Sequence, residues 1–234
     1  MNPDRRHWGW YLSSLFYKRT YFDIGHQLDE DLFAYLGDRT KGAVVADCGC
    51  GPGVVTGKFL KREAARVLAI DVSAAMLHQV RTSLANAIAV GQVVSVRKSF
   101  APELFFQLRH QFLGGAGLDI ILFKRSLYVE QDQALDILQA AVENLNPGGV
   151  LAVIHPERLL RRYAFGPGLR PKHYTLFHLF NRAVSKLGEK LGIGDYTLYT
   201  QEELLNLLRT AGAGRQVELI PSEQQAYNLV AIRN

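Results

Sequence analysis

Two carboxylates and a run of glycines are the residues best suited to chemistry in this 234-residue chain. An apolar, β-branched run ends in Asp47, and Gly49, Gly51 and Gly53 follow it at alternate positions. The apolar run predicts a buried parallel strand, and the glycines predict a turn whose backbone can lie against a nucleotide. Because the stretch after the glycines has a helix-like composition, the pattern indicates the opening of a nucleotide-binding βαβ unit.

Glycine spacing and a second carboxylate narrow the kind of nucleotide. A dinucleotide fingerprint, G-x-G-x-x-G counted from Gly49, would need its third glycine where Val54 stands. A second apolar run, residues 66–71, predicts a strand that ends in Asp71, 20 residues after Gly51. A carboxylate at that place can accept hydrogen bonds from both hydroxyls of a ribose. These residues therefore disfavour a dinucleotide and favour a ligand that contains a ribose.

The loop and the second carboxylate together resemble the first motifs of the class I S-adenosylmethionine-dependent methyltransferases. The resemblance covers residues 28–155 and 200–234, and it is most specific in the glycine loop and in Asp71. It implies that Asp47 and the glycines hold the methionine and ribose parts of S-adenosylmethionine. It also implies that the carboxylate of Asp71 binds the ribose.

Further residues of the cofactor site follow from the same resemblance. Val72 and Met76 belong to the second motif, with Met76 expected to face the adenine, and Ser99 and Phe100 follow a third apolar run. Many members of the family carry an acidic residue where Ser99 stands, so a contact to the adenine amino group would come from the serine hydroxyl. Lys124, after the fourth apolar run, lies where family members contact cofactor and substrate.

Apolar periodicity and turn residues predict the elements that must position this site. Ser73 is expected to cap one helix, helical spacing marks residues 131–145, and a capping box at Thr200 to Glu203 opens a helix near the carboxyl terminus. Proline and glycine at residues 146–149 predict a turn. Further strands are expected over residues 93–97, 118–123, 150–155, 216–220 and 226–232. The pattern and the resemblance predict an α/β, Rossmann-like fold with a seven-stranded, mostly parallel sheet and helices on both faces.

Length and composition predict a single domain over residues 1–234, which the resemblance identifies as a methyltransferase domain. Residues 1–27 are expected to form an N-terminal helical cover, and residues 156–199 are expected to be an insertion that forms a lid over the substrate. Cys48 and Cys50 lie too close together in a tight turn to predict a disulfide, and further ligands for a metal are absent nearby. We therefore expect packed thiols and no metal site.

Basic charge is concentrated in the insertion. From residue 156 to residue 190 there are eight basic residues against two acidic ones, whereas the whole chain carries a net charge of +5. One hypothesis is a lid in which Arg161 and Arg162 attract an acidic substrate. The other is a solvated helix face whose apolar side packs on the core.

Four residues are candidates for contact with the substrate or for proton transfer. The resemblance implies that the ring of Tyr17 or Tyr21 faces the sulfonium in a cation–π contact; the alternative is that these aromatic residues cover a sheet edge. The resemblance places Tyr128 near cofactor and substrate. His155 ends the fifth strand, where it would point to the ligand-binding edge as a general base or pack as a turn residue before Pro156.

Membrane and targeting segments are not expected. Apolar runs stay shorter than the roughly 18–20 residues of a membrane span, and the charged start lacks the apolar core of a signal peptide. These observations favour a cytoplasmic protein without a membrane span, and they leave the oligomeric state open.

Together these features predict an S-adenosylmethionine-dependent methyltransferase that acts on a small molecule, anionic or aromatic. After the fourth strand the chain reads Phe123-Lys-Arg-Ser126 and lacks the Asn/Asp-Pro-Pro-Tyr pattern typical of methylation on base amino groups. Two alternatives stay open. The basic, aromatic insertion supports an RNA methyltransferase, and Ser99 with the lack of an evident base supports a non-catalytic S-adenosylmethionine-binding protein.

Overall fold

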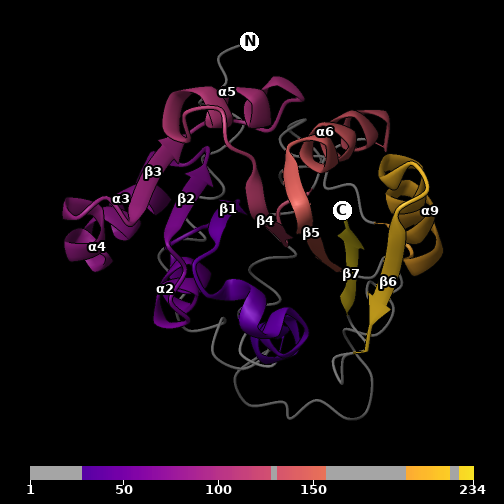
Figure 1. Cartoon of the computed structure of the whole chain (residues 1–234), viewed down its shortest axis with the longest axis horizontal. Coiled ribbons are helices and arrows are strands. Elements are labelled where there is room, and N and C mark those ends of the chain that lie inside the picture. Colours follow the sequence, from indigo (N-terminus) through magenta and orange to yellow (C-terminus); the bar gives the residue numbers. More distant parts are fainter. Residues whose placement is uncertain (1–27, 128–130, 157–198, 222–226) are drawn as a thin grey trace, which may run out of the picture.

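Seven strands form one sheet, in the order β3-β2-β1-β4-β5-β7-β6 (Figure 1). The computed structural model describes residues 28–127, 131–156, 199–221 and 227–234. The strands β1 to β5 run parallel, whereas β7 is antiparallel to both β5 and β6. The predicted seven-stranded, mostly parallel sheet is confirmed. The strands are β1 (Val44–Cys48), β2 (Arg66–Asp71), β3 (Val93–Arg97), β4 (Leu118–Lys124), β5 (Leu145–Pro156), β6 (Gln216–Ile220) and β7 (Tyr227–Arg233).

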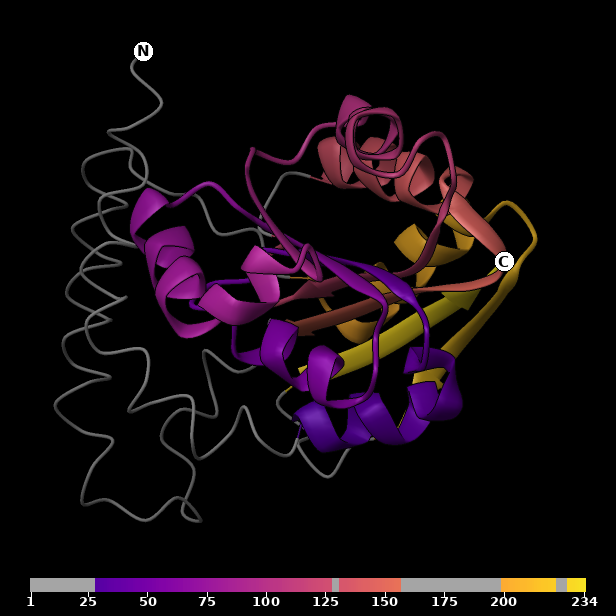
Figure 2. The same ribbon diagram turned by 60° about the vertical axis from the view of Figure 1, so that its left-hand side comes forward.

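Helices cover both faces of the sheet (Figure 2). Residues 28–36 are helical and share one apolar cluster with α2, in which the rings of Phe33 and Phe59 meet edge to face with centroids 4.9 Å apart. The helices α5, α6 and α9 cover the opposite face in a second cluster. The remaining bounds are η2 (Gly37–Thr40), α2 (Val54–Lys61), α3 (Ala74–Ser83), α4 (Ala85–Ala89), α5 (Glu103–Phe112), α6 (Gln131–Glu143) and α9 (Gln201–Gly212). In the described ranges, no helix has the length and apolar character needed to cross a bilayer.

Strand alternation decides which side chains share a face near the carboxyl ends of the strands. Val45 packs in the cluster of the 28–36 segment and α2, and Asp47 lies two residues further along β1 on that same face. In β4 the same alternation places Lys124 with Leu122 on this face. His155 falls on the opposite face, because its neighbour Ile154 belongs to the cluster of the 28–36 segment and α2. The sheet therefore separates His155 from Asp47 and Lys124.

The start of β5 differs from the sequence prediction. The expected turn at 146–149 is wrong, because the strand begins at Leu145 and includes these residues at a register shift opposite Leu118 and Ile120. Gly148 takes a φ of 78°, which lets the backbone bend without leaving the sheet. A side chain on Gly149 would place its Cβ 2.9 Å from the carbonyl oxygen of Asn146. The glycines thus permit a bulge within the strand rather than a turn before it.

The predicted capping box at the start of α9 is confirmed. The backbone N–H of Glu203 donates to Thr200 Oγ1 at 3.2 Å, and the backbone N–H of Thr200 donates to Glu203 Oε2 at 2.8 Å. Both bonds satisfy N–H groups that have no partner inside the helix. The cap positions the buried face of α9 against α6 and the sheet.

We expect Thr200→Ala to lower the free energy of unfolding by about 1 kcal/mol, because the helix loses a side-chain acceptor at its first turn. Urea denaturation of the full chain measures this change. Thr210→Ala is the matched control, since the Thr210 hydroxyl is exposed and donates only to the carbonyl of Asn206 within the same helix. Equal effects of the two substitutions would contradict the stabilising role of the cap.

Candidate functional site

The glycine loop after β1 has a backbone that most residues cannot adopt. Gly49, Gly51 and Gly53 have φ angles of 76°, 54° and 82°, all in the left-handed region. The N–H groups of Gly49 and Cys50 donate to the carbonyl of Ile70 at 2.8 and 2.9 Å. Gly53 then forms the N-cap of α2. The loop is thus fixed to the end of β2 while it turns into the helix.

The first glycine is also required by the close approach of the chain after β4. A Cβ on Gly49 would lie 2.2 Å from Ser126 Cβ and 2.9 Å from Ser126 Oγ. The Ser126 hydroxyl donates to the carbonyl of Cys48 at 2.6 Å, which fixes the segment after β4 against the loop. The ring of Phe100 reaches the same place, 3.6 Å from that Cβ position. Only glycine at position 49 allows this arrangement.

The carboxylate of Asp71 connects the loop to the next helix. Its Oδ2 accepts from the Gly51 N–H at 3.0 Å, and its Oδ1 accepts from the Ser73 N–H at 2.8 Å. Ser73 in turn caps α3, as predicted, by accepting the Met76 N–H at 3.3 Å. Each carboxylate oxygen can accept more than one hydrogen bond, so these bonds leave acceptor capacity for a diol. Binding of a ribose by Asp71 stays a prediction.

Asp47 is a buried carboxylate beside the loop. Its side chain is 2% exposed, and Oδ2 accepts a hydrogen bond from the Thr56 hydroxyl at 2.7 Å. Burial raises the pKa of Asp47 to about 6, while the Thr56 hydrogen bond and the charge of Lys124 oppose the rise. The carboxyl of Asp47 therefore changes its charge near pH 6 rather than near pH 4.

Lys124 supplies a buried cation on the same face. It is 8% exposed at the end of β4, and its ammonium pairs with Asp29 Oδ1. The other oxygen of Asp29 pairs with Lys58 Nζ at 2.8 Å. Burial lowers the pKa of Lys124 to about 8, and Asp29 acts against this shift. Asp29 was not among the residues predicted from sequence, because nothing in its helical neighbourhood marks it as buried and paired.

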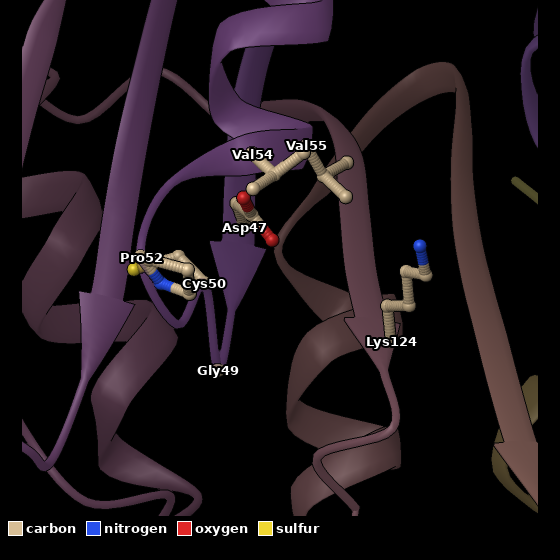
Figure 3. A pocket seen from close by; sticks show the side chains of 7 residues that line it. All are labelled: Asp47, Gly49, Cys50, Pro52, Val54, Val55 and Lys124. Atoms are coloured by element: carbon tan, nitrogen blue, oxygen red, sulfur yellow. The ribbon is translucent and has the colours of Figure 1, made fainter. Parts of the chain in front are cut away.

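Asp47 and Lys124 line the same small pocket beside the glycine loop. In Figure 3 Asp47 extends from β1 close to Gly49, and Lys124 extends from the neighbouring strand β4. A pocket with one group of each sign can bind a ligand that carries an ammonium and a carboxylate. Its lining residues are Asp47, Gly49, Cys50, Pro52, Val54, Val55 and Lys124.

The other predicted cofactor residues lie around the carboxyl ends of β2 and β3. Val72 is half-buried and Met76 is buried in the first turn of α3. Ser99 is exposed, and Phe100 packs edge to face on Phe123 with ring centroids 5.3 Å apart. The structure thus brings these residues to the edge that carries the glycine loop. Their contact with a cofactor stays a prediction.

His155 lies in a setting unlike the expected open edge. Its side chain is fully buried, its Nε2 accepts the backbone N–H of Tyr199 at 3.4 Å, and the two rings are 5.0 Å apart. This packing is on the face covered by α6 and α9, away from Asp47 and Lys124. A catalytic role for His155 stays a prediction.

The predicted substrate residues lie outside the described part of the chain. They are Tyr17, Tyr21, Tyr128, Arg161 and Arg162. The cysteines are described, and both Cys48 and Cys50 are free and buried, as expected for packed thiols. Within the described ranges, no group of three or more His, Cys, Asp or Glu side chains is placed to hold a metal ion.

Comparison with known sequences finds methyltransferases. Residues 45–149 match the family model described as "Methyltransferase domain". The chain is also 31% identical over 143 residues to ribosomal RNA small subunit methyltransferase C of Escherichia coli O9:H4 and of Shigella sonnei. That alignment covers 59% of this chain and 37% of each relative, so the chain spans little more than a third of the length of these curated relatives.

Solved methyltransferases share the fold. An O-methyltransferase family protein from Burkholderia thailandensis superposes with a TM-score of 0.64 at 16% identity, covering 93% of this chain and 58% of the other. The 1,6-didemethyltoxoflavin-N1-methyltransferase of the same organism, solved with 1,6-didemethyltoxoflavin and S-adenosylhomocysteine, gives 0.59 at 23%, covering 96% and 85%. Magnesium protoporphyrin IX methyltransferase from Synechocystis with S-adenosylhomocysteine gives 0.58 at 14%, covering 90% and 84%.

We expect Gly49→Ala to destabilise the chain by about 1–3 kcal/mol more than Gly91→Ala, because only the first substitution forces a methyl group into Ser126. The two glycines share a φ of 76°, and a Cβ on Gly91 meets nothing within 4 Å, so backbone strain is matched. Denaturant unfolding compares the two variants. Equal losses of stability would show that the loop does not depend on the close approach to Ser126.

Asp47 predicts a pH-dependent stability. Because its pKa is raised from 3.8 to about 6, the native state holds this proton more tightly than the unfolded chain does. The stabilisation from that proton is present below about pH 4 and is lost as the pH rises through about 6. We therefore expect Asp47→Asn to raise the free energy of unfolding at about pH 8 by roughly 1–3 kcal/mol, with the gain vanishing near about pH 4.

Denaturant unfolding at both pH values measures this gain, and the exposed Asp38→Asn serves as the control. A variant that is less stable than the wild type at the higher pH would contradict the cost assigned to the buried carboxylate.

Proposed function

We propose that this chain is a class I S-adenosylmethionine-dependent methyltransferase and that it methylates a small molecule, anionic or aromatic; the match of residues 45–149 to a methyltransferase domain and the shared fold support this. The observation that carries the proposal is the joint arrangement of the glycine loop, Asp71 and the pocket between Asp47 and Lys124. These groups lie at the carboxyl ends of β1, β2 and β4. Because β1 stands between β2 and β4, they surround the point where the strand order reverses, which is where open α/β sheets bind ligands.

The chemistry of this site fits S-adenosylmethionine. Its methionine part carries an ammonium and a carboxylate, which match the charges of Asp47 and Lys124 in one pocket. Its ribose diol matches the two oxygens of Asp71. The glycine backbone lies open to the ligand without a side chain. The residues present therefore support the cofactor that the family uses.

Methyl transfer depends mainly on how the enzyme positions the methyl group and the acceptor atom. S-adenosylmethionine supplies an electrophilic methyl group when bound, and the displacement is in line. The residues of this chain would hold the amino-acid end between Asp47 and Lys124 and the ribose at Asp71, which leaves the methyl group directed toward the substrate. A general base is needed only for an acceptor that carries a proton at the working pH. His155 remains the candidate base proposed from sequence, and its burial against Tyr199 does not supply further support.

Several observations favour a small-molecule acceptor over RNA. From the last residue of β4 the chain reads Lys124-Arg125-Ser126, with Arg125 at a φ of 55°, in place of the proline pattern typical of base methylation. Two of the solved proteins with this fold are named for small molecules, magnesium protoporphyrin IX and 1,6-didemethyltoxoflavin. The RNA alternative is supported by the basic insertion and by the ribosomal RNA methyltransferases among the relatives. The third alternative is a protein that binds the cofactor and does not react.

The rest of the sequence prediction extends this proposal. Residues 1–27, with Tyr17 and Tyr21, would cover the site, and residues 156–199 would form a lid in which Arg161 and Arg162 bind the acidic group of the substrate. The resemblance adds Tyr128 to the substrate side. One domain over residues 1–234 and a cytoplasmic location belong to the same proposal.

The test of the function is methyl transfer from labelled S-adenosylmethionine into a fractionated cell extract. We expect the label in the small-molecule fraction. Label in RNA, with activity that falls several-fold per doubling of salt, would establish the RNA alternative instead. Cofactor binding without label in any fraction would establish a binding protein.

We expect Asp71→Asn to weaken binding of S-adenosylhomocysteine by about tenfold or more, because the amide replaces one acceptor oxygen by a donor. The remaining oxygen can still accept an N–H from the loop or from Ser73, so the chain should fold. Isothermal titration calorimetry measures the affinity, with the exposed Asp136→Asn as control. Unchanged affinity in folded Asp71→Asn protein would remove the ribose assignment.

Substitution of Arg161 and Arg162 by Glu should raise the KM for an acidic substrate, because the lid would then repel it. The affinity for S-adenosylhomocysteine should stay unchanged, because the proposed lid residues bind the substrate and not the cofactor. Steady-state kinetics on the acceptor identified above measures the effect. Reversal of the basic residues Lys61 and Arg209, which are exposed on α2 and α9, changes the net charge by the same amount. A KM that responds equally to both reversals would assign the effect to net charge and not to the lid.

A further inference from the structure

A single buried carboxylate joins three elements beside the proposed cofactor pocket. Asp29 belongs to the helical segment 28–36 and is fully buried. Its Oδ1 pairs with Lys124 at the end of β4, and its Oδ2 pairs with Lys58 of α2 at 2.8 Å. The segment 28–36 is thereby connected by charge to the strand and to the helix on the two sides of the pocket.

The charge of Lys124 depends on this contact. A buried ammonium costs free energy unless it is paired and hydrogen-bonded, and Asp29 supplies both the charge and the acceptor. The same lysine lines the pocket with Asp47 and lies close enough to lower the pKa of that carboxyl. Asp29 itself is not among the residues that line the pocket. It therefore acts on the pocket through Lys124.

We propose that Asp29 is a positioning residue that keeps the Lys124 ammonium charged and in place at the cofactor pocket, so that cofactor binding depends on how the segment 28–36 packs against the sheet. This inference rests on the proposed function. It adds a residue remote from the glycine loop to the determinants of cofactor affinity, and it connects the N-terminal part of the chain to the pocket.

The direction of the expected pH dependence follows from the groups around Lys124. These are Asp29 from the segment 28–36, Lys58 from α2, Asp47 from β1 and the neighbouring Arg125. The pKa of Lys124 is lowered to about 8, chiefly by burial; Asp29 opposes this shift, and the charges of Arg125 and Lys58 contribute to it. Loss of the Asp29 charge therefore lowers the pH at which Lys124 gives up its proton.

Calorimetric titration of the full chain with S-adenosylhomocysteine, from about pH 6.5 to about pH 9, tests the inference. For the wild type we expect affinity to fall as Lys124 deprotonates above about pH 8. For Asp29→Asn the fall should begin about one pH unit lower, and affinity at about pH 8 should be about tenfold weaker. The amino group of the ligand titrates alike with every variant, so differences between variants report on the protein.

Glu30→Gln is the matched control. Glu30 is the next residue of the same segment and also pairs with Lys58, at 3.7 Å, but its side chain is 44% exposed. We expect its affinity and pH profile to stay within about twofold of the wild type, as for a solvated ion pair. A substitution that merely loosens the segment would affect the level of binding without moving the pH at which binding is lost.

Lys124→Arg keeps the inference testable where Asp29→Asn does not fold. Arginine stays protonated throughout this range, so the part of the alkaline fall that comes from residue 124 should disappear. Failure of the wild type to bind S-adenosylhomocysteine would overturn the proposed function and this inference with it. If the wild type binds, two results would overturn this inference and leave the proposed function standing. One is an Asp29→Asn variant with the pH profile of the wild type, and the other is a Lys124→Arg variant whose affinity still falls at alkaline pH.

Discussion

Burial of opposite charges in one pocket is the constraint on which the surrounding structure depends. Asp47 and Lys124 both lie beneath the glycine loop with little access to water, and each charge would cost several kcal/mol without compensation. Thr56 donates to Asp47 from the first turns of α2, and Asp29 pairs with Lys124 from the segment 28–36. Such a costly arrangement is typical of functional sites, where charge is kept for a ligand. The two elements that cover this face of the sheet thus also support the pocket.

The backbone around this pocket is determined by close contacts that only glycine allows. The loop accepts the approach of Ser126 at Gly49 and is fixed to β2 through Ile70 and Asp71. Strands β1, β2 and β4 are therefore held together at their carboxyl ends, where the strand order reverses. This geometry is the basis of the proposed site for a nucleoside with an amino-acid group. The choice between a small-molecule and an RNA acceptor depends on the basic residues of 156–190, which lie outside the described ranges.

The parts of the fold set by local pattern could be predicted from sequence, and the parts set by distant contacts could not. Strands β2, β3 and β6 have the expected bounds, since each is an apolar run closed by turn residues. The capping box at Thr200 and the N-cap at Ser73 are likewise local. Asp29 and Lys124 are 95 positions apart in the sequence, and no local sequence pattern predicts that they pair. The face on which His155 lies could be assigned only from the register of β5. The proline and glycines at the start of this strand predict a turn, whereas the structure has a bulge there.

A crystal structure of the full chain with S-adenosylhomocysteine would show directly whether the glycine loop and Asp71 form the cofactor site. We expect one ligand at the carboxyl ends of β1 and β2. Its ribose hydroxyls should lie within hydrogen-bonding distance, about 2.5–3.2 Å, of the Asp71 carboxylate. Its amino-acid group should lie between Asp47 and Lys124, with the ammonium toward the aspartate. A ligand bound elsewhere, or one whose ribose and amino-acid group leave Asp71, Asp47 and Lys124 untouched, would contradict this assignment.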